Sequence, residues 1–184
     1  MADFFTQISQ AVSQSPAIGD TRVLAIDGPA GAGKTTLAAH LVKVLSASGS
    51  LSVIHMDWIY DGWEGALGTS LTEKLSAIIG SLQKGETIKL DIYNWHSGVF
   101  DQVREIAPAK VLIIEGVGAA QKVIRDSGAT SIWLDIAPEA GMKRVLARDG
   151  DAIEAQMKGW LITQDKYFHR DLTPQSTDFS LSAT

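Results

Sequence analysis

Residues that could bind and transfer a phosphate group lie together near the start of the chain. Gly28, Gly33, Lys34 and Thr35 complete the pattern Gly-x-x-x-x-Gly-Lys-Thr. Glycines let backbone N–H groups wrap around an anion without Cβ clashes, and a following helix adds partial positive charge at its N-terminus. The pattern predicts a loop in which Lys34 reaches the β- and γ-phosphates of ATP and the Thr35 hydroxyl binds Mg²⁺. The residues expected to contact the nucleotide are Gly28, Ala30, Gly31, Ala32, Gly33, Lys34, Thr35 and Thr36.

Two acidic residues follow apolar runs that read as buried strands. Asp57 comes after the run 51–56, and Glu115 stands near the end of the run 110–116. Parallel α/β sheets bind ligands beyond the carboxyl ends of their strands, so both carboxylates are expected near the loop. Asp57 would orient or deprotonate a substrate hydroxyl, unless it only starts a turn. Glu115 would hold Mg²⁺ or contact substrate, unless it faces solvent.

Aromatic and polar residues gather in the segments 58–63 and 93–98, a mixture that suits a site for a small polar ring. The first segment holds Trp58, Tyr60 and Trp63, and the second holds Tyr93, Trp95 and His96. Tyr60, Tyr93, Trp95 and His96 are predicted to contact the substrate, together with the two carboxylates. The alternatives are aromatic side chains that belong to the core and a histidine that lies on the surface.

A cationic helix face is expected near the phosphates. Pro138 opens a helix that runs to Arg148, and Arg144 lies four residues earlier on the same face. The two arginines would stabilise the charge on a transferring phosphoryl group, as would Lys34. The alternative is a basic last turn that complements the helix dipole or pairs with a neighbouring aspartate.

The order of strands and helices predicts the fold that positions these residues. Strands are expected at 22–26, 51–56, 110–116 and 130–136, with a last edge strand at 177–181. Helices are expected at 3–15, 36–45, 121–125 and 152–168, and a further one from a capping box at Ser70 to Gln83. Extended segments are expected at 87–95 and 100–106. This alternation predicts a three-layer α/β/α domain of the P-loop NTPase type, with a mostly parallel sheet of about five strands. We expect a single domain over 1–184, with substrate bound by about 58–100 and lid-side helices in about 138–170.

Composition narrows the classes of partner. The formal net charge of −5 gives no support for a nucleic-acid polymer or an anionic membrane as partner. The sequence has no cysteine, which excludes disulfides, thiolate metal sites and cysteine nucleophiles. No apolar run is long enough for a membrane span and no leader is recognisable, so a cytoplasmic protein is expected. A homo-oligomer stays possible.

Five short motifs, in their order along the chain, resemble the uridine (uridine–cytidine) kinases. They are Ile26–Thr36, Met56-Asp57-x-x-Tyr60, Tyr93-x-Trp95, Ile114-Glu115-Gly116 and Arg144-Val145-Leu146-x-Arg148-Asp149. The resemblance covers roughly 22–149. Two departures stand out. The family usually reads Tyr-Asp-Phe where this chain has Tyr93-Asn94-Trp95, and its arginine-rich lid is replaced by the arginine-free stretch 150–154.

The resemblance implies a kinase that uses ATP and Mg²⁺ to phosphorylate a nucleoside hydroxyl. It implies that Asp57 is the catalytic carboxylate, that Tyr60 and Tyr93 lie at the nucleoside, and that Arg144 and Arg148 belong to the lid side. Two alternatives stay open. One is a kinase for another small hydroxyl compound, such as a pantothenate-like or sugar-like metabolite. The other is a regulatory protein that binds ATP without catalysis.

Overall fold

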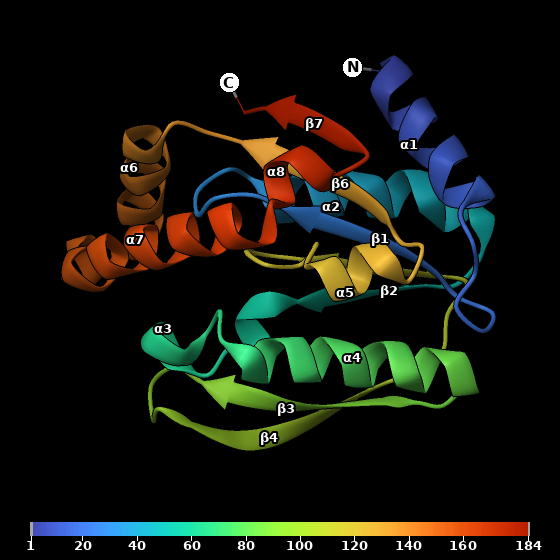
Figure 1. Cartoon of the computed structure of the whole chain (residues 1–184), viewed down its shortest axis with the longest axis horizontal. Coiled ribbons are helices and arrows are strands. Elements are labelled where there is room, and N and C mark those ends of the chain that lie inside the picture. The colour runs from blue at the N-terminus through green and yellow to red at the C-terminus, as the bar shows by residue number, and fades with distance from the viewer. Residues whose placement is uncertain (1, 184) are drawn as a thin grey trace.

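The computed structural model describes residues 2–183 (Figure 1). Its centre is a sheet of five strands in the order β2-β5-β1-β6-β7, and every neighbouring pair is parallel. These strands are β1 (Arg22–Asp27), β2 (Leu51–His55), β5 (Val111–Glu115), β6 (Thr130–Asp135) and β7 (Phe179–Ser182). The predicted parallel sheet of about five strands is confirmed, and the last strand lies at its edge as expected.

Side chains of the inner strand β1 alternate between two apolar cores. Val23 and Ala25 belong to the core on one face of the sheet, whereas Leu24 and Ile26 belong to the core on the other. A strand that is buried on both faces has no polar side to present. For this reason its sequence reads as a continuous apolar run. β5, whose five residues are all buried, lies between β2 and β1 for the same reason.

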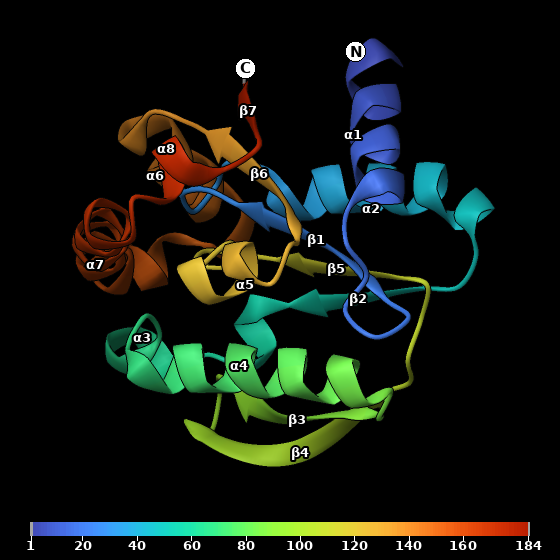
Figure 2. The ribbon, with the colours of Figure 1, turned by 45° about the vertical axis from the view of Figure 1, so that its right-hand side comes forward.

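Helices cover both faces of the sheet, as Figure 2 shows. One face carries α1 (Ala2–Gln14) and α2 (Lys34–Leu45), and the other carries α4 (Thr69–Lys84), α5 (Lys122–Asp126) and α7 (Glu154–Asp171). The remaining helices and 3₁₀ turns are α3 (Gly62–Gly65), α6 (Pro138–Asp149), α8 (Thr173–Ser176), η1 (Ser46–Ser48), η2 (Met56–Trp58) and η3 (Asp151–Ile153). Within residues 2–183, no helix combines the length and apolar character needed to cross a bilayer.

A separate antiparallel hairpin stands outside the three layers. It consists of β3 (Ile88–Asn94) and β4 (Val99–Ile106), and α4 lies between it and the main sheet in both views (Figures 1 and 2). The alternate residues Ile88 and Leu90 are buried beneath α4. The strand pairing shifts register between Ile92 and Tyr93, near the turn. The hairpin thereby carries the 93–98 turn to the carboxyl end of β2.

The predicted capping box at the start of α4 is wrong. The helix begins at Thr69 with Gly68 as its N-cap, and no side chain caps it. Ser70 and Thr72 therefore lie inside the first turn. The Thr72 hydroxyl donates instead to Gln121 Oε1 at 2.7 Å, which ties α4 to the segment before α5. A tertiary hydrogen bond has replaced the local one that the sequence pattern suggested.

Candidate active site

The predicted phosphate-binding loop connects β1 to α2 and has the backbone that an anion cradle requires. Gly28, Gly31 and Gly33 have positive φ angles of 145°, 80° and 95°. A Cβ at Gly28 would lie 2.1 Å from the Leu134 carbonyl oxygen, and one at Gly31 would lie 2.3 Å from the Gly141 carbonyl oxygen. A side chain at either position would collide with a backbone oxygen, and the positive φ would also strain any residue other than glycine. The loop therefore needs glycine there.

Lys34, the first residue of α2, folds back over the loop. Its Nζ donates to the carbonyl oxygens of Gly28 at 2.7 Å and Pro29 at 2.8 Å. Burial lowers the pKa of this amine, while the nearby carboxylates of Asp27, Glu115 and Asp57 oppose the shift. The amine thus lies in the hollow of the loop, where it can meet bound phosphates as a point charge.

Asp27, at the end of β1, is a buried structural anchor that the sequence reasoning gave no role. Its carboxylate accepts hydrogen bonds from the backbone N–H groups of Gly28 at 2.7 Å, Gly118 at 2.9 Å and Ala120 at 2.9 Å. Burial raises its pKa to about 6, and these three hydrogen bonds act against that rise. Asp27 therefore joins the phosphate-binding loop to the loop that follows β5.

A second contact that sequence reasoning missed joins the phosphate-binding loop to α7. The Ala30 N–H donates to Gln164 Oε1 at 3.0 Å, and Gln164 is only 5% exposed. Ala30 was expected to contact the nucleotide, and its N–H is thus already bonded within the protein. One signal was available in the sequence. Gln164 lies one turn after Trp160 on the buried stripe of α7, where an amide side chain requires a partner.

Three polar side chains meet at the base of the cavity. The Thr35 hydroxyl donates to Glu115 Oε1 at 3.0 Å, and His55 Nδ1 contacts the same oxygen. His55 and Glu115 are register partners on β2 and β5, which explains their contact. The hydrogen bond to Glu115 raises the pKa of His55. His55 was not predicted, because its partner could be found only once the strand order was known.

The donor set at this point fits Mg²⁺ as a partly protein-bound ion. Thr35 and Glu115 offer a hydroxyl and a carboxylate oxygen side by side, which are the hard ligands that Mg²⁺ prefers. No group of three or more acidic, histidine or cysteine side chains suited to a metal occurs among the described residues. An ion held here would complete its coordination with phosphate and water oxygens, as Mg²⁺ commonly does.

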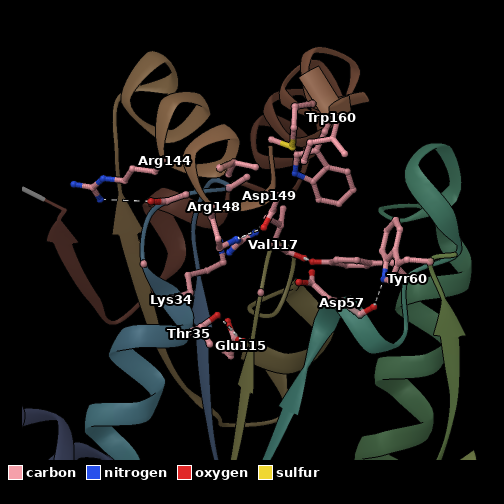
Figure 3. Close-up of a pocket in the computed structure, with 18 of the residues that line it drawn as sticks. Lys34, Thr35, Asp57, Tyr60, Glu115, Val117, Arg144, Arg148, Asp149 and Trp160 are labelled. Carbon is pink, nitrogen blue, oxygen red and sulfur yellow. Dashed lines mark hydrogen bonds and ion pairs between the residues drawn. The ribbon is translucent and has the colours of Figure 1, made fainter. Parts of the chain in front are cut away.

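Asp57 lies across the cavity from Lys34 (Figure 3). It belongs to the 3₁₀ turn η2 directly after β2, so the parallel strand end points it toward the loop as predicted. Its backbone carbonyl accepts a 2.9 Å hydrogen bond from Trp95 Nε1 of the hairpin turn. Burial, with the adjacent Glu115 charge as a second cause, raises the pKa of the Asp57 carboxyl. A carboxyl with a raised pKa is suited to take up a proton.

The two predicted arginines of α6 also line the cavity. Arg148 pairs with its neighbour Asp149, through Nε at 2.7 Å and Nη2 at 2.6 Å. Arg144 Nη1 donates to the Gly31 carbonyl oxygen at 3.5 Å. Both guanidinium groups therefore lie on the same side as the phosphate-binding loop, and Arg148 also has the aspartate partner that the sequence left open.

The cavity enclosed by these elements has a volume of about 570 Å³. Its far wall consists of four aromatic side chains, Tyr60, Trp63, Trp95 and Trp160. Tyr60 and Trp160 point into the cavity in Figure 3. Trp160 was not predicted, because it lies on α7, a long way along the sequence from the other three. Trp58, by contrast, stacks under Arg104 at 3.9 Å and packs against His55.

Four of the predicted ligand-contacting residues are not among the described residues that line the cavity. Tyr93 packs behind Trp95 and against Phe100, with ring centroids 5.1 and 5.2 Å away. His96 is exposed in the hairpin turn, and its backbone N–H donates to Asn94 Oδ1. Gly28 lies beneath the loop against β6, and Ala32 is buried in the core. The other predicted site residues all line the cavity.

Comparisons with known proteins agree with this architecture. The model of the phosphoribulokinase/uridine kinase family matches residues 69–179. A phosphoribulokinase from Synechocystis sp. is 25% identical over 138 residues, which are 69% of this chain and 41% of that protein. The chain thus spans about two fifths of the length of that curated relative.

Two solved structures share the fold over nearly the whole chain. A possible uridine kinase from Bacillus stearothermophilus has a TM-score of 0.69 at 20% identity, with 98% of each chain covered. A putative fructose transport system kinase from Silicibacter sp. has a TM-score of 0.68 at 18% identity, with 96% of this chain and 98% of that chain covered. At these identities the likeness concerns the fold.

Proposed function

The chain belongs to the phosphoribulokinase/uridine kinase family, and from this premise we propose that it is a small-molecule kinase. It transfers the γ-phosphoryl group of ATP to a hydroxyl group of a nucleoside-like acceptor. One observation carries the proposal: Lys34 and the phosphate-binding loop face Asp57 across a single cavity. A phosphate-binding wall opposite a carboxylate is what in-line transfer to a hydroxyl requires.

The phosphate side of the cavity would hold the donor. Backbone N–H groups of the loop and the N-terminus of α2 bind the phosphate oxygens. Lys34, Arg144 and Arg148 add positive charge where the transferring phosphoryl group accumulates negative charge. Bound phosphates would also compete with the carbonyl oxygens that Lys34 contacts here, so Lys34 can change partners without leaving the loop.

The acceptor hydroxyl would lie at Asp57. The carboxylate orients the hydroxyl and accepts its proton as the new O–P bond forms. Trp95 keeps Asp57 in place through the hydrogen bond to its backbone carbonyl. Thr35 and Glu115 would hold Mg²⁺ at the base of the cavity, where the ion neutralises phosphate charge.

The nucleoside-like acceptor is supported by the motif resemblance and by the aromatic far wall, which can receive a planar base. The family also includes phosphoribulokinase, so membership alone leaves the acceptor open. A sugar-like or pantothenate-like acceptor would be phosphorylated with the same phosphate side of the cavity and with Asp57 in the same role. A protein that only binds ATP would keep the loop and need no acceptor.

The test measures ATP consumption with Mg²⁺ against a panel of nucleosides, simple sugars and pantothenate. Lys34→Ala serves as the blank. Asp57→Asn is expected to lower turnover about 100-fold or more with nucleotide binding retained, because it removes the proton acceptor and leaves the loop intact. Asp20→Asn, the same change at an exposed loop aspartate, should leave turnover unchanged. Two results would refute the kinase assignment: turnover that is unchanged in Asp57→Asn, or nucleotide binding without any acceptor-dependent turnover.

A further inference from the structure

His55 is a half-buried histidine that has no part in the phosphoryl transfer proposed above. It is the last residue of β2, and in the parallel pairing of β2 with β5 it lies directly opposite Glu115. Paired residues on neighbouring strands project to the same face of the sheet, so the two side chains meet. His55 Nδ1 contacts Glu115 Oε1. Because an ionised carboxylate can only accept a hydrogen bond, Nδ1 is the donor.

The two oxygens of the Glu115 carboxylate have different surroundings. Oε1 accepts from His55 and, at 3.0 Å, from the Thr35 hydroxyl. Oε2 accepts no hydrogen bond from residues 2–183, and it is not among their buried polar atoms that lack a partner. Glu115 lines the cavity beside Thr35 (Figure 3). The two donors on Oε1 therefore leave Oε2 for a ligand that enters the cavity.

The imidazole ring of His55 is itself held in place by packing. The indole of Trp58 contacts it edge to face, with ring centroids 4.8 Å apart and an interplanar angle of 69°. The Arg104 guanidinium, from strand β4 of the hairpin, lies 3.9 Å from the centroid of the Trp58 ring. The hairpin thus supports His55 through Trp58, and an imidazole that is fixed in this way restrains the carboxylate that it holds.

We propose that His55 is a positioning residue for the metal site: its Nδ1–H and the Thr35 hydroxyl together hold the Glu115 carboxylate so that Oε2 is presented to Mg²⁺. This inference rests on the proposed use of Mg²⁺ with ATP and adds a residue to it. A glutamate side chain rotates freely, whereas Mg²⁺ demands near-ideal octahedral geometry, so a carboxylate that is already fixed loses less freedom when it binds the ion. Hydrogen-bond partners of metal ligands commonly contribute about 10- to 100-fold to metal affinity.

The experiment measures how much Mg²⁺ strengthens nucleotide binding. The probe is a non-hydrolysable ATP analogue with an imido group between its β- and γ-phosphates, and calorimetry follows its binding to the whole chain. The affinity at saturating Mg²⁺ is divided by the affinity in EDTA, and we call this quotient the Mg²⁺ ratio. No acceptor and no turnover are involved. The ratio is taken within each variant, so a change that affects both affinities equally does not alter it.

Three substitutions of His55 test its donor atom. His55→Leu removes the donor and should lower the Mg²⁺ ratio about tenfold, with the affinity in EDTA retained. His55→Asn should restore most of the ratio, because the asparagine amide nitrogen can take the place of Nδ1. His55→Gln should restore less, because its amide nitrogen lies nearer the place of Nε2. The control is His40→Leu, the same change at an exposed histidine of α2 beside Phe5, which should leave the ratio unchanged.

A pair of variants tests whether His55 acts through Glu115. Glu115→Ala should itself lower the Mg²⁺ ratio. Adding His55→Leu to it should cause no further fall, because no carboxylate is left to position. A further fall in the double variant would show that His55 acts by another route, and it would overturn the inference.

Three further results would overturn the inference: no effect of Mg²⁺ on binding to the native chain, a native Mg²⁺ ratio in His55→Leu, or equal losses in His55→Asn and His55→Leu. The kinase function is judged separately, by acceptor-dependent consumption of ATP. Turnover together with a native ratio in His55→Leu would refute the role of His55 and leave the kinase function standing. A lowered ratio in His55→Leu, with no turnover by the native chain, would refute the kinase function and retain the role of His55.

Discussion

The two walls of the cavity are built in opposite ways. The phosphate-binding wall is contiguous in the sequence, within 28–36, and uses mainly backbone groups. The opposite wall, which we call the aromatic ring wall, consists of Tyr60, Trp63, Trp95 and Trp160, and these side chains come from four separate segments. A wall built from backbone groups requires glycines at fixed spacing, and this spacing is a pattern that can be recognised in the sequence. A side-chain wall requires only that distant segments meet, and this leaves little pattern in the sequence.

Two contacts tie elements of the aromatic ring wall to the rest of the site. On α7, Gln164 holds the Ala30 N–H of the phosphate-binding loop, and Trp160, one turn earlier, belongs to the aromatic ring wall. On the hairpin, Trp95 belongs to the same wall and also holds the backbone of Asp57. Changes to these residues should therefore separate effects on donor binding from effects on the acceptor side.

Gly31→Ala should damage the phosphate-binding wall most. The residue has a φ of 80°, and its Cβ would lie 2.3 Å from a backbone oxygen of α6. We expect a loss of about 3 kcal/mol or more in the free energy of unfolding, together with loss of nucleotide binding. Urea unfolding and nucleotide titration measure the two effects. Gly80→Ala is the control, because a Cβ at this position in α4 meets nothing within 4 Å. This change should raise the free energy of unfolding by about 1 kcal/mol, since alanine favours the helix more than glycine does. Unchanged nucleotide binding in Gly31→Ala would contradict the backbone-built wall.

The Asp27 anchor predicts a dependence of stability on pH. Burial raises its pKa from 3.8 to about 6, so the folded chain binds more protons than the unfolded chain between these values. The contribution of Asp27 to the unfolding free energy is therefore complete below the unfolded pKa and falls as pH rises, by about 3 kcal/mol in all. Denaturant unfolding across this window should show the fall in the native protein and not in Asp27→Asn. If the unfolding free energy of Asp27→Asn falls with pH as steeply as that of the native protein, another group is responsible.

Gln164→Leu should weaken the phosphate-binding wall by a smaller amount. The change leaves the half-buried Ala30 N–H without its acceptor, which should cost about 1 kcal/mol of stability and weaken nucleotide binding. The KM for the acceptor should change less. Gln156→Leu, at an exposed position of the same helix, should leave nucleotide binding as it is. Equal weakening of donor and acceptor binding would instead indicate general damage to α7.

Trp95→Phe should have the smallest effect and act on the acceptor side. The substitution keeps an aromatic ring and removes the N–H that holds the Asp57 carbonyl, a hydrogen bond of about 1 kcal/mol. We expect kcat to fall about fivefold with the KM for ATP unchanged. Steady-state kinetics with each substrate varied in turn will measure this. A raised KM for ATP would show that Trp95 acts on both walls.

Several features of the fold could be predicted because they depend on local sequence. The inner strands β1, β5 and β6 are mostly apolar runs that are buried on both faces, and the positive-φ glycines stand where the motif requires them. The predicted cap of α4 failed because Thr72 bonds to Gln121 in another element. His55 and Gln164 were missed for a related reason. Their partners lie 60 and 134 residues away.

The sequence by itself determined the phosphate-binding loop, the α/β alternation and the strand ends where Asp57 and Glu115 stand, because each follows from the spacing of neighbouring residues. Only the tertiary structure decided that Trp160 joins Tyr60, Trp63 and Trp95, and that Tyr93 and His96 stay outside the cavity. Helix packing and the hairpin's register fix these positions. Both depend on contacts between segments far apart in the chain, which no local pattern encodes.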